Sequence, residues 1–155
     1  MRNGTRTATD SHIADTGDEP APLPADAVLA DEGLAPADAA RPGQVLLLAC
    51  GALAREILAL IRANGWDHMT LACLPAKLHL WPDRIPAAVE EAVSHHRDRF
   101  ERIFVVYADC GTGGRLQETC RRLGVEMVEG PHCYAFFDGL DDFAARAEDE
   151  IGTFY

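Results

Sequence analysis

Residues 102–114 read RIFVVYADCGTGG, a strand-like apolar run that leads directly into a glycine-rich turn. A nearly continuous apolar run is typical of a strand in a parallel sheet whose two faces are both covered. The glycines allow the backbone to turn sharply after Asp109 and Cys110. A helix is predicted over 115–123, so this stretch has the strand–turn–helix order of an α/β protein.

The same order repeats along the rest of the ordered chain. We predict further strands at 45–49, 69–73 and 125–128, further helices at 52–64, 86–99 and 140–151, an irregular segment at 74–86 and a loop at 130–137. Helices that alternate with strands across short connections favour one three-layer, Rossmann-like α/β domain with a mostly parallel sheet. This domain is expected to span residues 44–155. Because the chain stops just after a helix, we also expect the domain to be truncated at its C-terminus.

Residues 1–43 differ in composition from the rest of the chain. They are rich in alanine, proline and aspartate, and they carry eight acidic residues against three arginines. Such a segment has little apolar surface to bury, so we predict a disordered acidic tail.

Charge and cysteine content limit the classes of function. A net charge of -11 over 155 residues disfavours binding to nucleic acid or to an anionic membrane surface. The chain contains no apolar run of the ~18 residues that a membrane helix needs and no signal-peptide pattern. Five cysteines without a secretory signal indicate reduced thiols, metal ligands or catalytic groups, and therefore a cytoplasmic protein.

Four of the five cysteines follow predicted strands, and two histidines lie near them. Parallel strands end at one edge of the sheet, where open α/β sheets bind their ligands. We therefore predict a metal site there, with zinc favoured over an iron–sulfur centre or cobalt because its ligands would be thiolate and imidazole. The candidate ligands are Cys50, Cys73, Cys110, Cys133 and His132, with His79 as an alternate.

The glycine-rich turn suggests a second kind of site. Gly111, Thr112, Gly113 and Gly114 precede a predicted helix, and such a turn can hold the phosphate or carboxylate of a cofactor. The turn lacks the lysine of a P-loop and the spacing of a dinucleotide fingerprint, so neither nucleotide class is supported. Cys120, inside the predicted helix, is expected to be structural.

Several of these motifs together resemble the domain-of-unknown-function family numbered 1638, which occurs in methanogenic archaea and many bacteria. The resemblance lies in CGALAREILALI (50–61), CLPAKLH (73–79), YADCGTGG (107–114), GPHCYAFF (130–137) and GTFY (152–155). It implies that the six candidate ligands above match the pattern of the family. Leu80 is a departure, since the family often has asparagine there. Members are often encoded near corrinoid-dependent methyltransferases, which implies a corrinoid protein or a methyltransferase as partner.

Three hypotheses follow, and the sequence leaves open whether the protein is an enzyme. The first is a metal-binding protein that serves corrinoid-linked methyl transfer or one-carbon metabolism. The second is a metal-free thiol enzyme with Cys110 as nucleophile and His132 as its base. The third is a non-catalytic accessory module of a methyltransferase system.

Overall fold

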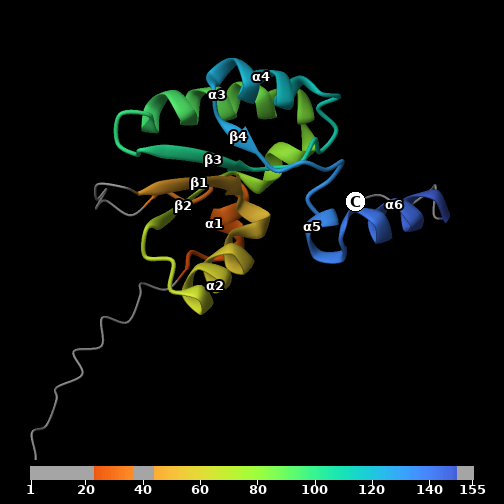
Figure 1. The fold of residues 1–155 in the computed structure, drawn as a ribbon, viewed down its shortest axis with the longest axis horizontal. Coiled ribbons are helices and arrows are strands. Elements are labelled where there is room, and N and C mark those ends of the chain that lie inside the picture. The colour runs from red at the N-terminus through yellow and green to blue at the C-terminus, as the bar shows by residue number, and fades with distance from the viewer. Residues whose placement is uncertain (1–22, 37–43, 150–155) are drawn as a thin grey trace, which may run out of the picture.

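The computed structural model describes residues 23–36 and 44–149. A parallel sheet of four strands in the order β2-β1-β3-β4 forms its centre (Figure 1). The strands are β1 (Val45–Cys50), β2 (Met69–Leu74), β3 (Arg102–Val106) and β4 (Glu126–Met127). The α/β class and the parallel sheet predicted from the sequence are confirmed.

Helices lie on both sides of the sheet, with α1 and α2 on one side and α3 and α4 on the other, while α5 and α6 extend beyond its edge (Figure 1). Their bounds are α1 (Asp26–Asp31), α2 (Ala54–Asn64), α3 (Ile85–His96), α4 (Arg115–Leu123), α5 (Ala135–Asp138) and α6 (Leu140–Asp149). Three 3₁₀ turns connect these elements: η1 (Gly51–Leu53), η2 (Ala76–Leu80) and η3 (Pro82–Arg84). None of the helices in the described ranges is long and apolar enough to cross a membrane.

Strand β1 explains the layered arrangement, because its side chains alternate between two cores. Leu46 and Leu48 belong to the core that contains residues of α3 and α4, and Leu47 and Ala49 belong to the core that contains residues of α1 and α2. Both sets of side chains are buried. A strand covered on two faces requires the continuous apolar run seen in the sequence.

The prediction of a disordered tail is wrong for residues 23–36. Helix α1 buries Leu29, which is 4% exposed, in the core beside α2. Leu34 exchanges two backbone hydrogen bonds with Cys73 at distances of 2.8 and 2.9 Å, and thus extends the sheet beyond β2. The remaining parts of the predicted tail, 1–22 and 37–43, lie outside the described residues.

Two segments that we predicted to be irregular contain short helical turns. The segment 74–86 folds into η2, η3 and the start of α3, and the predicted loop 130–137 contains the start of α5. The last predicted helix is present as α6, and residues 150–151 lie outside the described part of the chain. These turns position both histidines of the site described below.

Candidate metal centre

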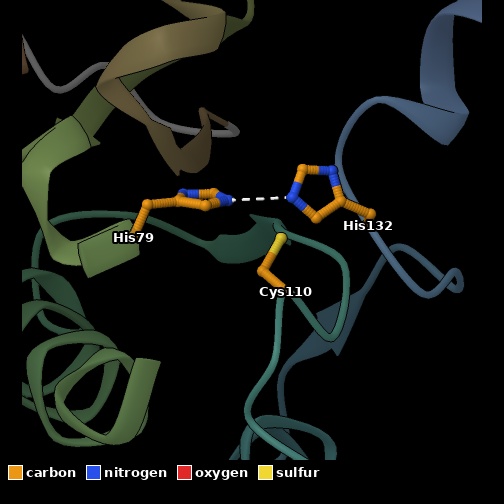
Figure 2. Close-up of side chains that lie close together, drawn as sticks. All are labelled: His79, Cys110 and His132. Atoms are coloured by element: carbon orange, nitrogen blue, oxygen red, sulfur yellow. Dashed lines mark hydrogen bonds between the residues drawn. The ribbon is translucent and has the colours of Figure 1, made fainter. Parts of the chain in front are cut away.

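Three side chains meet at the carboxyl edge of the sheet: His79 from η2, Cys110 from the turn after β3, and His132 from the turn after β4 (Figure 2). Their ligand atoms all lie within 4.8 Å of one another. The two histidines face each other with 3.2 Å between their Nε2 atoms. Cys110 is buried and both histidines are half-buried, so this group could hold a metal ion at the surface of the domain.

Backbone pairing beyond the ends of β3 and β4 brings two of these residues together. The amide of Asp109 donates to the carbonyl of Gly130, and the amide of Cys110 donates to that of Pro131. Cys110 therefore lies beside the turn that carries His132. It also has a φ of 47°, the one positive φ at a non-glycine residue in the described ranges. Backbone strain of this kind concentrates at functional sites.

The glycine-rich turn already holds an anion of the chain itself. The Asp109 carboxylate accepts hydrogen bonds from the amides of Gly113 and Gly114, at 3.1 and 2.7 Å, and from the Thr112 hydroxyl at 2.8 Å. The structure thus places a fixed carboxylate where the sequence suggested that Gly111 and its neighbours bind a cofactor phosphate. The turn shapes the backbone around Cys110 instead.

Cys133 lies directly behind Cys110, with 3.0 Å between the two sulfurs. This distance is shorter than the about 3.8 Å that separates two sulfurs bound to one tetrahedral zinc ion. The hydrogen bond with Cys133 is the main cause that lowers the pKa of Cys110, and the same bond is the main cause that raises the pKa of Cys133. Cys133 is therefore placed as a thiol that donates to the Cys110 thiolate.

Cys50 lies on the other side of His79. Its sulfur is 4.0 Å from Nδ1 of His79, and it lies outside the group of three ligand atoms. Cys50 thus contacts the ring nitrogen of His79 that points away from His132.

Cys73 is not part of this cluster, although we expected it to be a ligand. In the register of the sheet, Cys73 pairs with Ala49, and both belong to the core on the α1 and α2 side. Cys50, one residue further along β1, belongs to the opposite core with Cys110 and Cys133. Burial raises the pKa of Cys73 to about 12, so it is a neutral core thiol.

The cluster has an asymmetric electrostatic pattern. Hydrogen bonds to Cys110 and then to Cys50 raise the pKa of His79 to about 10. Burial lowers the pKa of His132. The basic partner of the Cys110 thiolate is therefore His79, whereas the sequence suggested His132.

A backbone contact limits the protonation of His132. The amide of Tyr134 donates to Nδ1 of His132 over 3.2 Å. A neutral imidazole carries one proton, so this contact favours a proton on Nε2 of His132, where it faces and is repelled by the Nε2 proton of the His79 imidazolium. At 3.2 Å the two Nε2 atoms have room for one proton, or for one metal ion in its place. A metal at Nε2 of His132 requires the proton on Nδ1 and therefore a small movement of the Tyr134 amide.

Sequence reasoning missed two residues beneath the cluster. Asp109 precedes a run of threonine and glycines, and that order is typical of an aspartate that caps its own turn. Tyr107 is fully buried, and its hydroxyl has no hydrogen-bond partner among the residues that the structure describes. Nothing in its sequence context distinguishes Tyr107 from an ordinary core aromatic residue.

A wide groove lies at the other end of the sheet. It has a volume of about 790 Å³ and is lined by the first residues of all four strands and by residues of α2: Val45, Met69, Arg102, Glu126, Ile57 and Ile61. This end of the sheet is opposite the carboxyl edge. The groove contains no member of the thiol–imidazole cluster, so it takes no part in the chemistry of that cluster.

The fold and the cluster together define an α/β domain with a histidine–cysteine–histidine group that could hold a metal ion at the carboxyl edge of its sheet. A family model described as "Protein of unknown function (DUF1638)" matches residues 73–155, more than half of the chain. The chain belongs to this family, which confirms the resemblance seen in its motifs. The match contains the three residues of the cluster and Cys133, while Cys50 precedes it. No curated protein and no solved structure gave a significant match.

Proposed function

We propose that the protein binds a zinc ion through Nε2 of His79, Nε2 of His132 and Sγ of Cys110, and that a fourth position at the metal is open to a substrate. The observation that carries this proposal is the convergence of three ligand atoms, from segments far apart in the sequence, to within 4.8 Å. Three protein ligands and an open position are typical of catalytic rather than structural zinc.

The distances support this arrangement. Two imidazole nitrogens on one tetrahedral zinc ion are about 3.4 Å apart, and those of His79 and His132 are 3.2 Å apart. The sulfurs of Cys110 and Cys133 are closer than two zinc-bound sulfurs would be. Cys133 is therefore better placed to donate a hydrogen bond to Cys110 than to bind the same ion.

The open position gives the site its chemistry. A metal ion lowers the pKa of a bound thiol and holds it as a thiolate. A substrate thiol at the fourth position would lose its proton and, as a thiolate, attack the methyl group of its donor. With a methylated corrinoid as donor, a carbon–sulfur bond would form, the cobalt–carbon bond would break, and its electron pair would stay on cobalt. We propose methyl transfer as the setting because of the family resemblance, with a corrinoid protein or a methyltransferase of the cytoplasm as the partner.

Exposed apolar side chains beside the site support docking of such a partner. Leu80 and Trp81 directly follow His79 and are 72% and 45% exposed. Tyr134 and Phe137 follow His132 and are 54% and 56% exposed. Exposed apolar residues that gather around a functional site favour a protein contact.

One observation favours a second candidate, a metal-free thiol enzyme. Cys110 has a lowered pKa and His79 a raised one, so the two form a thiolate–imidazolium pair without any metal. Such a pair activates the nucleophile of cysteine hydrolases and transferases. In that case His79, rather than His132, is the base.

Metal analysis of protein purified without oxygen tests the first candidate against the second. We expect about one zinc per chain in the wild type and a large loss in Cys110→Ser, because serine is a poor zinc ligand. Cys120→Ser is the matched control, since Cys120 is equally buried but lies inside α4. Full zinc in Cys110→Ser would contradict the proposed site.

The same variants separate the candidates by reactivity. A metal-free enzyme would contain no zinc, and its Cys110 would react with a small alkylating reagent much faster than Cys120. A zinc-bound Cys110 would be protected until a chelator is added. Transfer of a methyl group from a methylated corrinoid protein to a thiol, lost in Cys110→Ser and retained in Cys120→Ser, would support the proposed reaction.

A further inference from the structure

We propose that Cys50 and Tyr107 are positioning residues for the metal and are not ligands. The Cys50 sulfur accepts a hydrogen bond from Nδ1–H of His79, and the Tyr107 hydroxyl donates a hydrogen bond to the same sulfur. This inference rests on the proposed metal site. It replaces the expectation that Cys50 itself binds the ion.

His79 needs such support because of where it lies. It is carried by the 3₁₀ turn η2, which has no fully buried residue and packs on the core only through the partly buried Ala76 and Leu78. Its two ring nitrogens face different partners, with Nε2 toward His132 and Nδ1 toward Cys50. A metal-binding histidine usually donates its second N–H to an acceptor, and that contact fixes both the tautomer and the orientation of the ring. Cys50 occupies the place of this acceptor.

Cys50 is well suited to hold the ring still. It is the last residue of β1, one of the two inner strands of the sheet, and it is 1% exposed. Its sulfur is 4.0 Å from Nδ1 of His79, while the ligand atoms of the cluster lie on the far side of the ring. An ion held between Nε2 of His79 and Nε2 of His132 would lie across the imidazole ring from Cys50.

Tyr107 supplies the second, independent observation. Its side chain is fully buried in the same core as Cys50, and its hydroxyl has no hydrogen-bond partner among the described residues. A buried hydroxyl without a partner is rare in folded proteins, and each case calls for an explanation. Burial is the main cause that raises the pKa of Tyr107, and the nearby Cys50 sulfur is the next, ahead of Cys133. We assign the Tyr107 hydroxyl as a hydrogen-bond donor to the Cys50 sulfur. The hydroxyl turns toward this sulfur when the sulfur accepts the hydrogen bond from Nδ1 of His79.

The test is zinc and cobalt binding by the full chain with Tyr107→Phe, Cys50→Ala and Cys50→Ser. Tyr107→Phe should weaken metal affinity about 10- to 100-fold. It should leave the melting temperature of the metal-free protein unchanged or higher, because it removes an unpaired buried hydroxyl. A merely structural role for Tyr107 would lower both quantities together. Cys50→Ala should weaken affinity by a similar factor, and Cys50→Ser, which keeps an acceptor, should largely restore it. Cys120→Ala is the control for loss of a buried thiol.

The cobalt spectrum separates a positioning residue from a ligand. The sulfur-to-cobalt absorption reports the number of bound thiolates, so it should be the same in Cys50→Ala and in the wild type. Its loss in that variant would make Cys50 a ligand and overturn the inference. Wild-type affinity in Tyr107→Phe and Cys50→Ala would also overturn it, while leaving the metal site intact. A wild-type protein that binds neither ion would overturn the proposed function, and this inference with it.

Discussion

Nε2 of His79 and Nε2 of His132 lie 3.2 Å apart, although 53 residues separate the two histidines in the chain (Figure 2). At this distance two ring nitrogens cannot both be protonated, nor can both present bare lone pairs, without repulsion. One proton or one cation between them removes the conflict. The number of protons released when zinc binds is therefore the most direct measure of how the two histidines are protonated.

Zinc binding at pH 7 should release about one proton per ion. The pKa of His79 is raised to about 10 by Cys110 and Cys50, so its proton must leave before a metal binds. The pKa of Cys110 is lowered, chiefly by the hydrogen bond with Cys133 and then by His79, so we expect this thiol to release no proton when zinc binds. Zinc affinity should therefore rise as the pH increases from 7 toward 10.

Calorimetry in buffers with different heats of protonation measures this number. Release of about two protons would mean that Cys133, whose pKa is raised, also becomes a ligand. Cys133→Ser would then return the number to about one. Release of no proton would contradict the pairing of Cys110 with His79.

Asp109→Asn should lower the melting temperature at neutral pH and reduce its dependence on acid. Burial tends to raise the pKa of Asp109, but hydrogen bonds from Gly114, Thr112 and Gly113 outweigh it and hold that pKa below its ordinary value of 3.8. A lowered pKa in the folded state stabilises the protein above pH 4, and this contribution is lost as the pH falls further. Wild-type protein should thus lose stability more steeply below pH 4 than the variant. Exposed Asp98→Asn is the control, and equal acid profiles for both variants would contradict the role of the turn.

The parts of the fold that the sequence predicted are those governed by local signals. Residues 45–49 form a continuous apolar run, and α2 and α4 end at Gly65 and Gly124, which both have a positive φ. The sequence also shows the glycine-rich turn after Cys110, but it does not show that the turn binds the Asp109 carboxylate. Its ligand is a side chain two residues before Gly111, and no count of glycines distinguishes an internal carboxylate from a bound phosphate.

The membership of the site was predicted only in part, because it depends on register. Neighbouring residues of a strand point to opposite faces, so a shift of one position decides which core a side chain enters. Cys73 pairs with Ala49 rather than with Cys50, and this single step separates it from the cluster. The sequence shows that both cysteines end strands, but not how the two strands are aligned. The inward placement of His79 likewise depends on η2, which has no clear periodic signal.

Leu29→Ala tests whether α1 is part of the folded domain. We expect a loss of about 2 kcal/mol, at the low end for a buried leucine because α1 can detach without unfolding the sheet. Amide exchange at Leu34, whose N–H donates to the carbonyl of Cys73, should accelerate with it. Val28→Ala on the exposed side of the same helix should change stability by no more than about 0.5 kcal/mol. If the two variants behave alike, residues 23–36 do not pack on the sheet.

Cys73→Ala should leave zinc stoichiometry and affinity unchanged, while Cys110→Ala should abolish binding. Both cysteines are buried; Cys73 lies one residue before the end of β2, and Cys110 lies beyond the end of β3. The pair therefore separates the effect of the sheet face from that of position along the strand. Cys73 lies in the core with Leu29 and Ala49, and its loss should cost only packing, about 1 kcal/mol. Cys110 supplies the one sulfur of the three-atom group, so its removal leaves two histidines. Zinc titration against a colorimetric chelator, together with thermal melts of both metal-free variants, measures the two effects separately. A drop in zinc affinity in Cys73→Ala comparable to that in Cys110→Ala would show that a thiol from the opposite face reaches the ion, and the three-ligand site would then be wrong.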